Sequence, residues 1–177
     1  MTASPLNYSV MKGIVSWTPV GGTLIDLGNC AKATLTVKPN FLDHYTSRQG
    51  IKAKDASVPV SLEAEVSLEL DEITAQVMSM SLFGVVADQV TGDPGYAVDG
   101  ALKKIAILSA SQIQGSLKIV GTNTIGKRGQ LVLPNVIFKA GSAFDFISDA
   151  EWSKATLSGE ALFDVSSSGF GEWFQLN

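Results

Sequence analysis

Hydrophobic and polar residues alternate one by one along several parts of this chain, as they do in β-strands, where successive side chains point to opposite faces. The longest run is VSLEAEVSLEL at residues 60–70, in which Val, Leu or Ala takes every even position and Ser or Glu every odd one. These eleven residues predict a long strand with an apolar face and a wet, acidic face. Shorter runs of the same kind lie at residues 31–38, 112–119 and 154–163.

Two further stretches, residues 102–108 and 131–138, are more continuously apolar, which is typical of strands covered on both faces. Pro134 lies within the second stretch and has no N–H for a strand ladder, so it predicts an edge or a bulge there. Glycine-rich clusters near residues 21–22, 27–29, 92–95 and 126–129 mark the expected turns.

One helix is expected to interrupt the strands. We predict Asp71 as its N-cap, Glu72 in the first turn, where it complements the helix dipole, and Gly84 at its end. The predicted apolar stripe consists of Ile73, Val77 and Met80. Strands, one helix and then more strands predict an all-β sandwich or barrel with one flanking α-helix.

Residues 40–57 interrupt the alternation and are too polar to be buried, so we expect an excursion from the core. Its charged residues surround Gly50 and are Asp43, Arg48, Lys52, Lys54 and Asp55. Residues 87–100, rich in Gly and Asp, predict a second loop. We find no internal repeat or domain boundary, and 177 residues fit one domain, spanning residues 1–177.

The net charge of the chain argues against tight nucleic-acid binding. The net charge is −4, with 13 Lys and Arg against 17 Asp and Glu. A tight nucleic-acid binder needs a basic excess to neutralise phosphates, so we expect no such binding. Charged residues make up 17% of the chain against a usual ~25%, and the mean hydropathy is +0.22. Both values are a weak indication of apolar surface kept for partners.

The single cysteine, Cys30, excludes an internal disulfide and fits a reducing compartment such as the cytoplasm. We expect it to be a small buried side chain. One Cys with one His cannot form a usual structural zinc site, so we expect no metal, and we expect no cofactor. The first ten residues lack the features of a secretory signal, and no apolar stretch approaches ~20 residues, so we expect a protein that is soluble when made.

Two motifs approach known catalytic or nucleotide-binding patterns without completing them. GTNTIGK at residues 121–127 resembles a phosphate-binding loop, but Arg128 stands where Ser or Thr is needed and a strand-like sequence follows in place of a helix. His44 has Asp43 beside it and Ser47 nearby, but triads are usually assembled from separate elements. We interpret the first as a polar turn and the second as an exposed loop, and we expect no enzyme.

Two charged clusters leave more than one interpretation open. Glu63 and Glu65 are about 7 Å apart along one strand face, within the range of paired glycosidase carboxylates. They lie in a uniform row, however, which is also typical of a solvated face, and such a row offers no contrast in pKa. Arg48, Lys52 and Lys54 suggest phosphate contact, yet Asp43 and Asp55 dilute them, which favours a salt-bridged loop or a protein contact.

Residues 45–74 carry a resemblance to a known family. YTSRQG at residues 45–50 is followed by Lys52, by Lys54 and Asp55, by the alternating strand, and by LDEIT at residues 70–74. In this order, the segments resemble the major tail tube proteins of bacteriophages with long non-contractile tails. The turn DLGN at residues 26–29, the strands at 131–147 and LSGEALFD at 157–164 extend the resemblance over most of the chain. The polar helix sequence AQVMSMSLFG at 75–84 and the 87–100 loop depart from it.

The resemblance implies a fold and an assembly. Members of the family have a β-sandwich with a flanking helix, and their sheets join around a six-membered ring into a shared β-barrel. The rings stack into a tube through which DNA is ejected into the host. An extended loop, matched here by residues 42–57, reaches the neighbouring ring. The implied partners are other copies of the chain and the tail tip or baseplate, terminator and tape measure proteins, without a membrane. The implied location is the virion tail, assembled in the bacterial cytoplasm.

The two charged clusters then receive hypothetical roles. We expect Glu63, Glu65 and Glu69 to line the lumen and to repel DNA, with reach limited to ~8 Å by salt. We expect contacts between stacked rings at Tyr45, Arg48, Lys52, Lys54 and Asp55.

Two alternatives remain. One is the inner tube of a contractile tail or secretion apparatus, which shares the fold. The other is a carbohydrate- or cell-surface-binding β-sandwich module, for which Trp17, Trp152 and Trp173 are widely scattered in sequence.

Overall fold

A computed structural model describes residues 11–48, 50–90, 92, 103–122, 126–139, 144–147, 149 and 151–176. Within this part the chain is mostly antiparallel β-strand with one short helix, which confirms the predicted all-β class with one helix. The elements are β1 (Gly13–Pro19), β2 (Ile25–Asp26), β3 (Cys30–Thr46), β4 (Ala53–Leu70), α1 (Ala75–Ser81), β5 (Val85–Asp88), β6 (Lys103–Ala106), β7 (Ile113–Gly121), β8 (Arg128–Lys139), β9 (Ala155–Ala161) and β10 (Glu172–Leu176).

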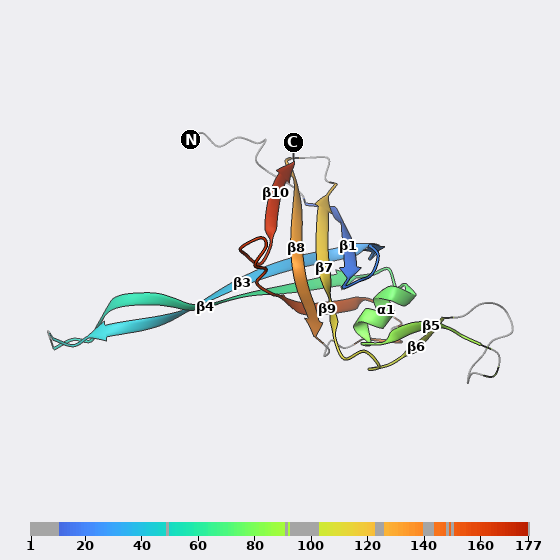
Figure 1. The fold of residues 1–177 in the computed structure, drawn as a ribbon, viewed down its shortest axis with the longest axis horizontal. Coiled ribbons are helices and arrows are strands. Elements are labelled where there is room, and N and C mark those ends of the chain that lie inside the picture. The colour runs from blue at the N-terminus through green and yellow to red at the C-terminus, as the bar shows by residue number, and fades with distance from the viewer. Residues whose placement is uncertain are drawn as a thin grey trace.

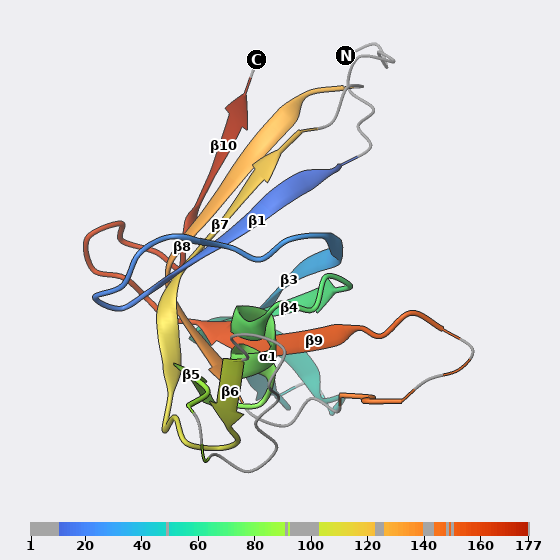
Figure 2. The same ribbon diagram turned by 90° about the vertical axis from the view of Figure 1, so that its right-hand side faces the viewer.

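One continuous sheet folds over on itself at β8. Among the described strands its order is β2-β1-β7-β8-β9-β4-β3, with β10 also pairing with β8. β10 pairs with residues 128–132 of β8, and β9 pairs with residues 136–139 along the same edge. The two ends of the sheet diverge beyond this point, so that β1, β7 and β10 form one layer and β9, β4 and β3 the other (Figure 2).

Pro134 lies at the fold of the sheet. In the pairing of β7 with β8, Gly115 faces Val136 and Leu117 faces Leu133, so Pro134 and Asn135 together oppose Ser116. This is a β-bulge, as Pro134 predicted. Pro134 also lies between the β10 and β9 ladders, where its missing N–H costs no ladder hydrogen bond. The bulge bends β8 and allows one strand to belong to both layers.

The hydrophobic core lies between the two layers. Trp17 of β1 and Phe138 of β8 pack with their ring centroids 5.0 Å apart, and both side chains are almost fully buried. From β4 the core receives Ala64, Val66, Leu68 and Leu70, from β9 Ala155, Leu157 and Ala161. Val77 and Met80 of α1 close one end. The alternation predicted for β4 and β9 is therefore confirmed where the two strands pair.

The helix begins later than predicted. Its N-cap is Thr74, whose Oγ1 accepts a hydrogen bond from the Val77 N–H at 3.2 Å, and not Asp71. The Asp71 carboxylate instead accepts from the Asn29 side chain at 2.6 Å, and Glu72 accepts from the Asn29 N–H at 3.0 Å. The prediction was wrong because these two carboxylates hold a turn that lies more than forty residues away in sequence.

Two residues shape the turn that follows α1. Phe83 adopts a left-handed φ of 49° and buries its ring in the core, while the Gly84 N–H donates to the Ser79 carbonyl at 2.8 Å. Glycine is required at 84 because an added Cβ would lie 2.5 Å from the Ile105 side chain of β6. The helix therefore ends at Ser81, with Leu82 as its C-cap, shortly before the predicted stop at Gly84, and close packing rather than a positive φ selects the glycine.

Strand β6 contradicts the prediction that residues 102–108 are covered on both faces. The strand spans Lys103–Ala106 and pairs with β5 alone in a separate two-stranded sheet. Ile107 and Leu108 beyond it are exposed. The apolar run reflects a short hairpin outside the main layers. Of the loop predicted at 87–100, residues 91 and 93–100 lie outside the described part.

The longest feature is a two-stranded arm. β3 and β4 pair from Cys30 with Leu70 out to Thr46 with Ala53. β9 pairs with β4 only from Ala64 inward, so we call residues 38–63, where β3 and β4 have no third strand, the arm. It projects far from the two layers (Figure 1). The excursion predicted as a loop is exposed as expected, but it is a paired hairpin with only residues 47–52 between its strands.

Candidate interaction surfaces

A charged polar face covers the outer side of the layer formed by β3, β4, β9 and the end of β8. Glu63, Glu65 and Glu69 share this face, as the alternation predicted, because their partners across the ladders are all polar. Lys32 pairs with Glu69 at 3.6 Å, and Lys38 forms an ion pair with Glu65. The predicted carboxylates are therefore interleaved with basic side chains.

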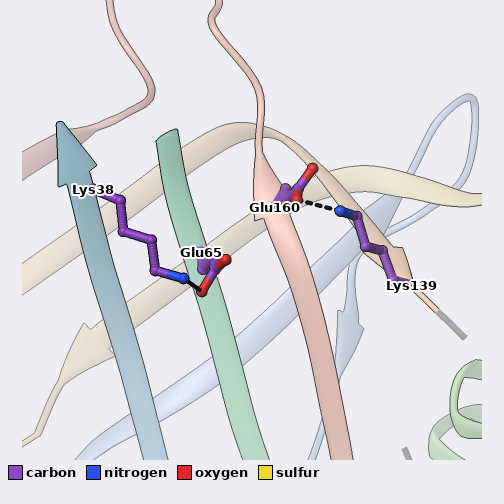
Figure 3. A network of polar contacts seen from close by, with 4 residues as sticks. All are labelled: Lys38, Glu65, Lys139 and Glu160. Carbon is purple, nitrogen blue, oxygen red and sulfur yellow. Dashed lines mark hydrogen bonds and ion pairs between the residues drawn. The ribbon is translucent and has the colours of Figure 1, made fainter. Parts of the chain in front are cut away.

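The Lys38–Glu65 pair and a further ion pair, between Lys139 and Glu160, form a single row across four strands (Figure 3). Glu65 of β4 lies directly opposite Glu160 of β9, an arrangement that by itself is repulsive. Lys38 neutralises Glu65 from one side, and Lys139 neutralises Glu160 from the other. From β3 to β8, the charges of the row are therefore positive, negative, negative and positive. Each exposed ion pair contributes at most ~0.2–1 kcal/mol to the stability of the fold. The main effect of the pairs is therefore on the charge of the surface.

The polar face is close to neutral overall. Along the paired and described parts of these strands it carries four carboxylates and three lysines, which leaves one excess negative charge. The carboxylates belong to Glu63, Glu65, Glu69 and Glu160, the amines to Lys32, Lys38 and Lys139. The sequence prediction of a purely acidic face considered β4 alone. Lys32 and Lys38 occupy polar positions of the 31–38 alternation, which is the signal that would have placed them here.

The outer part of the arm is held by cross-strand contacts of its own. Lys54 Nζ lies 2.7 Å from Asp43 Oδ1, and the hydrogen bonds from Lys54 and then Ser57 lower the pKa of Asp43 below its ordinary value. Lys52 lies over the Tyr45 ring, 4.8 Å from its centroid. Asp55 contacts His44 at 2.6 Å. Of the five residues expected to contact a neighbouring ring, four thus have partners within the arm, and Arg48 is exposed in the turn. The four are Tyr45, Lys52, Lys54 and Asp55.

His44 and Asp43 do not form part of a catalytic triad. His44 Nδ1 contacts Asp55 across the hairpin, while Asp43 is engaged by Lys54 and Ser57. Of the GTNTIGK segment, residues 123–125 lie outside the described part, and the flanking residues join β7 to β8. Among the described residues, no group of three or more His, Cys, Asp and Glu is placed to hold a metal ion.

An apolar groove separates the open edges of the two layers, and sequence reasoning did not anticipate it. Its volume is about 390 Å³. Side chains from β1, β7, β8 and β10 form one wall, and side chains from β3 form the other. The lining includes Val15, Cys30, Ala33, Leu35, Ile119, Leu131 and Trp173. Because Leu35 and Trp173 are 38% and 54% exposed, the groove opens to solvent.

Two local features shape this groove. The Trp173 indole packs against Gly129 of β8, where an added Cβ would come within 1.8 Å of the ring. Cys30 donates its thiol to the Lys32 carbonyl at 3.2 Å, and burial raises the pKa of this thiol. Cys30 is half-buried, less than the buried side chain that the sequence predicted, because it lies at the opening of the groove.

No protein-family model matches the chain, and no curated protein matches it significantly. In the described part of the chain, no helix has the length and apolar character needed to cross a bilayer. The functional interpretation therefore depends on the surfaces described above and on the sequence resemblance.

Proposed function

We propose that the chain is a structural subunit that polymerises as stacked hexameric rings into a bacteriophage tail tube, a conduit for DNA. The observation that carries this proposal is the arm. It exposes seven large hydrophobic side chains, and its strands have no third partner in the described subunit. These side chains are Phe41, Leu42, Tyr45, Ile51, Val58, Val60 and Leu62.

An arm of this kind favours assembly for an energetic reason. A two-stranded hairpin alone is marginally stable in water, and exposed aliphatic side chains lower the free energy when another surface covers them. A contact between an arm on one side of a subunit and a different surface on its neighbour is head to tail. Such contacts repeat into rings or filaments instead of closing as a dimer.

The open edge of β3 supports ring formation. β3 is the last strand of the described sheet order, and an unpaired edge invites pairing with another chain. Joining these sheets around a ring would remove the edges and create the shared barrel that the resemblance implies. The hexameric ring size, the tail tip, terminator and tape measure partners, and the virion location come from the resemblance alone.

The charged polar face suits the wall of a DNA conduit. With one excess negative charge among the seven charged side chains, it neither attracts phosphates by counterion release nor repels them strongly. DNA would slide along hydrated Ser, Thr, Lys and Glu side chains without specific binding. The role proposed for Glu63, Glu65 and Glu69 is thus to balance the lysines of this face. We propose no catalytic role.

The inner tube of a contractile tail or secretion apparatus would use the same arm and edges. A carbohydrate-binding module is less well supported. Trp17 is buried in the core and Trp173 lines the groove, whereas Trp152 is 89% exposed elsewhere, so these side chains form no shared platform.

Negative-stain electron microscopy of the purified protein at high concentration tests the proposal. We expect hollow tubes built of stacked rings. Particles that remain single subunits at every concentration, or that bind glycans without forming filaments, would refute it.

A further inference from the structure

Water is a poor occupant of the apolar groove. Its space is more than ten times the ~30 Å³ share of one water molecule, and its lining is mostly aliphatic or aromatic. Water in such a space finds few hydrogen-bond partners, so an apolar group that enters it gains free energy by displacing that water. The groove therefore favours hydrophobic side chains over a polar or charged ligand.

The arm carries side chains that match this requirement. Leu42 of β3 lies directly opposite Val58 of β4, so the two share one face, and they are 67% and 59% exposed. The next pair, Phe41 with Pro59, falls on the other face of the hairpin. An arm with apolar side chains on both faces is typical of a segment enclosed by other chains.

The area on the arm is that of a protein interface. At about 80 Å² each, the seven exposed hydrophobic side chains present on the order of 600 Å². Summed over both faces of the arm, this area approaches the ~800 Å² that each partner contributes to a stable complex.

The arm cannot fill the groove of its own subunit. Val58 lies twelve residues before Leu70, the residue that pairs with Cys30 at the groove, which places the two about 40 Å apart along β4. An arm that enters the groove must therefore come from a second copy.

We propose that the groove between β3 and β10 receives the Leu42 and Val58 side chains from the arm of a neighbouring copy. The proposal rests on the proposed function and specifies which surface receives the arm. The contact is apolar, whereas Arg48, Lys52 and Asp55 of the arm lie in its exposed outer part. Cys30, the sole cysteine of the chain, lies in the groove and supplies a probe for this contact.

The test is a disulfide between copies in assembled Val58→Cys protein under mild oxidation. A disulfide needs Cα atoms closer than ~7 Å, so Cys30 and position 58 of the same chain cannot join. Each chain would offer one thiol on its arm and one in its groove. We expect cross-links to run from copy to copy and to give a ladder of dimers, trimers and larger species on a non-reducing gel.

Two variants control for chance collisions. Val85 on β5 is 57% exposed, nearly the same as Val58, so Val85→Cys places a thiol of similar accessibility away from the arm. We expect it to give no ladder. Val58→Cys combined with Cys30→Ser removes the groove thiol, and its products should stop at dimers.

The outcomes separate the two proposals. Tubes with no ladder from Val58→Cys would overturn the groove contact and leave the proposed function in place. Failure of the wild-type protein to form tubes would overturn the proposed function itself.

If Val58→Cys does not assemble, maleimide labelling of Cys30 in the wild-type protein tests the groove contact instead. We expect at least a tenfold slower reaction in tubes than in free subunits. Equal rates would contradict occupation of the groove.

Discussion

The two halves of β4 have the same sequence pattern and opposite surroundings. In the inner half, Ala64, Val66 and Leu68 are almost fully buried, whereas Val60 and Leu62 in the outer half are 57% and 56% exposed. Alternation thus identifies the strand and its two faces, but it does not identify what covers them. Coverage depends on β9, which pairs with β4 only as far as Ala64, and on the opposite layer.

The same difference runs along β3. Ala33, Leu35 and Val37 pair with the buried Leu68, Val66 and Ala64, yet all three are exposed. They are the apolar side of an edge strand, with the groove over the inner two. The inner half is thus covered within the subunit, whereas the arm and the β3 edge expose apolar side chains, which is the contrast that the proposed assembly would explain.

A pair of identical substitutions measures the contrast in subunit stability, and it has the largest expected effect. Leu68 and Leu62 lie on one strand, six residues apart, and are 0% and 56% exposed. Leu68→Ala should lower the free energy of unfolding by about 2–5 kcal/mol because it leaves a cavity. Leu62→Ala should lower it by about 0.5 kcal/mol or less. Urea denaturation of unassembled subunits measures both, and similar losses would break the comparison.

Charge reversal tests the polar face, which continues from the inner half into the arm. Replacing Glu63, Glu65 and Glu69 by Lys leaves one carboxylate against six lysines, an excess of five positive charges. We expect tubes to form, to bind DNA with an affinity that falls steeply with salt, and to slow or block DNA ejection.

The matched control replaces the same three glutamates by Gln, which leaves an excess of two positive charges and should bind DNA more weakly. Salt-dependent binding of labelled DNA to tubes measures the difference. Unchanged DNA binding and ejection in the Lys variant would contradict the proposal that the polar face lines the lumen.

The smallest effect concerns the outer arm. Because the pKa of Asp43 is lowered, mainly by Lys54 and then by Ser57, its contacts stabilise the folded arm above the ordinary carboxyl pKa of ~3.9. That stabilisation is lost as the pH falls below about 4 and through the lowered pKa.

Titration of Asp43 by NMR checks this. Lys54→Met should raise the Asp43 pKa toward its ordinary value, and Ser57→Ala should raise it less. An unchanged pKa in Lys54→Met would mean that the cross-strand pair does not form in solution.

Much of the fold follows from local sequence. The alternating runs give β4, β7 and β9, and Pro134 gives the bulge at which β8 changes layers. The predicted N-cap failed because Asn29 draws Asp71 and Glu72 into a distant turn, a contact that local patterns do not contain.

The candidate surfaces depend even more on tertiary pairing. The lysines of the polar face come from strands other than β4, and the groove exists only because β3 and β10 diverge. Both would require the strand order before they could be predicted.

The arm itself provides the most direct test of the account. Replacing residues 42–58 by a two-residue Asn-Gly turn between Phe41 and Pro59 removes the Leu42–Val58 pair with the outer hairpin and leaves the core intact. We therefore expect a folded β-subunit with an unfolding free energy within about 0.5 kcal/mol of wild type. Analytical ultracentrifugation with electron microscopy should find this variant as single subunits under conditions in which the wild-type protein forms tubes. Tubes of normal length from the shortened protein would contradict the claim that the arm joins one copy to the next.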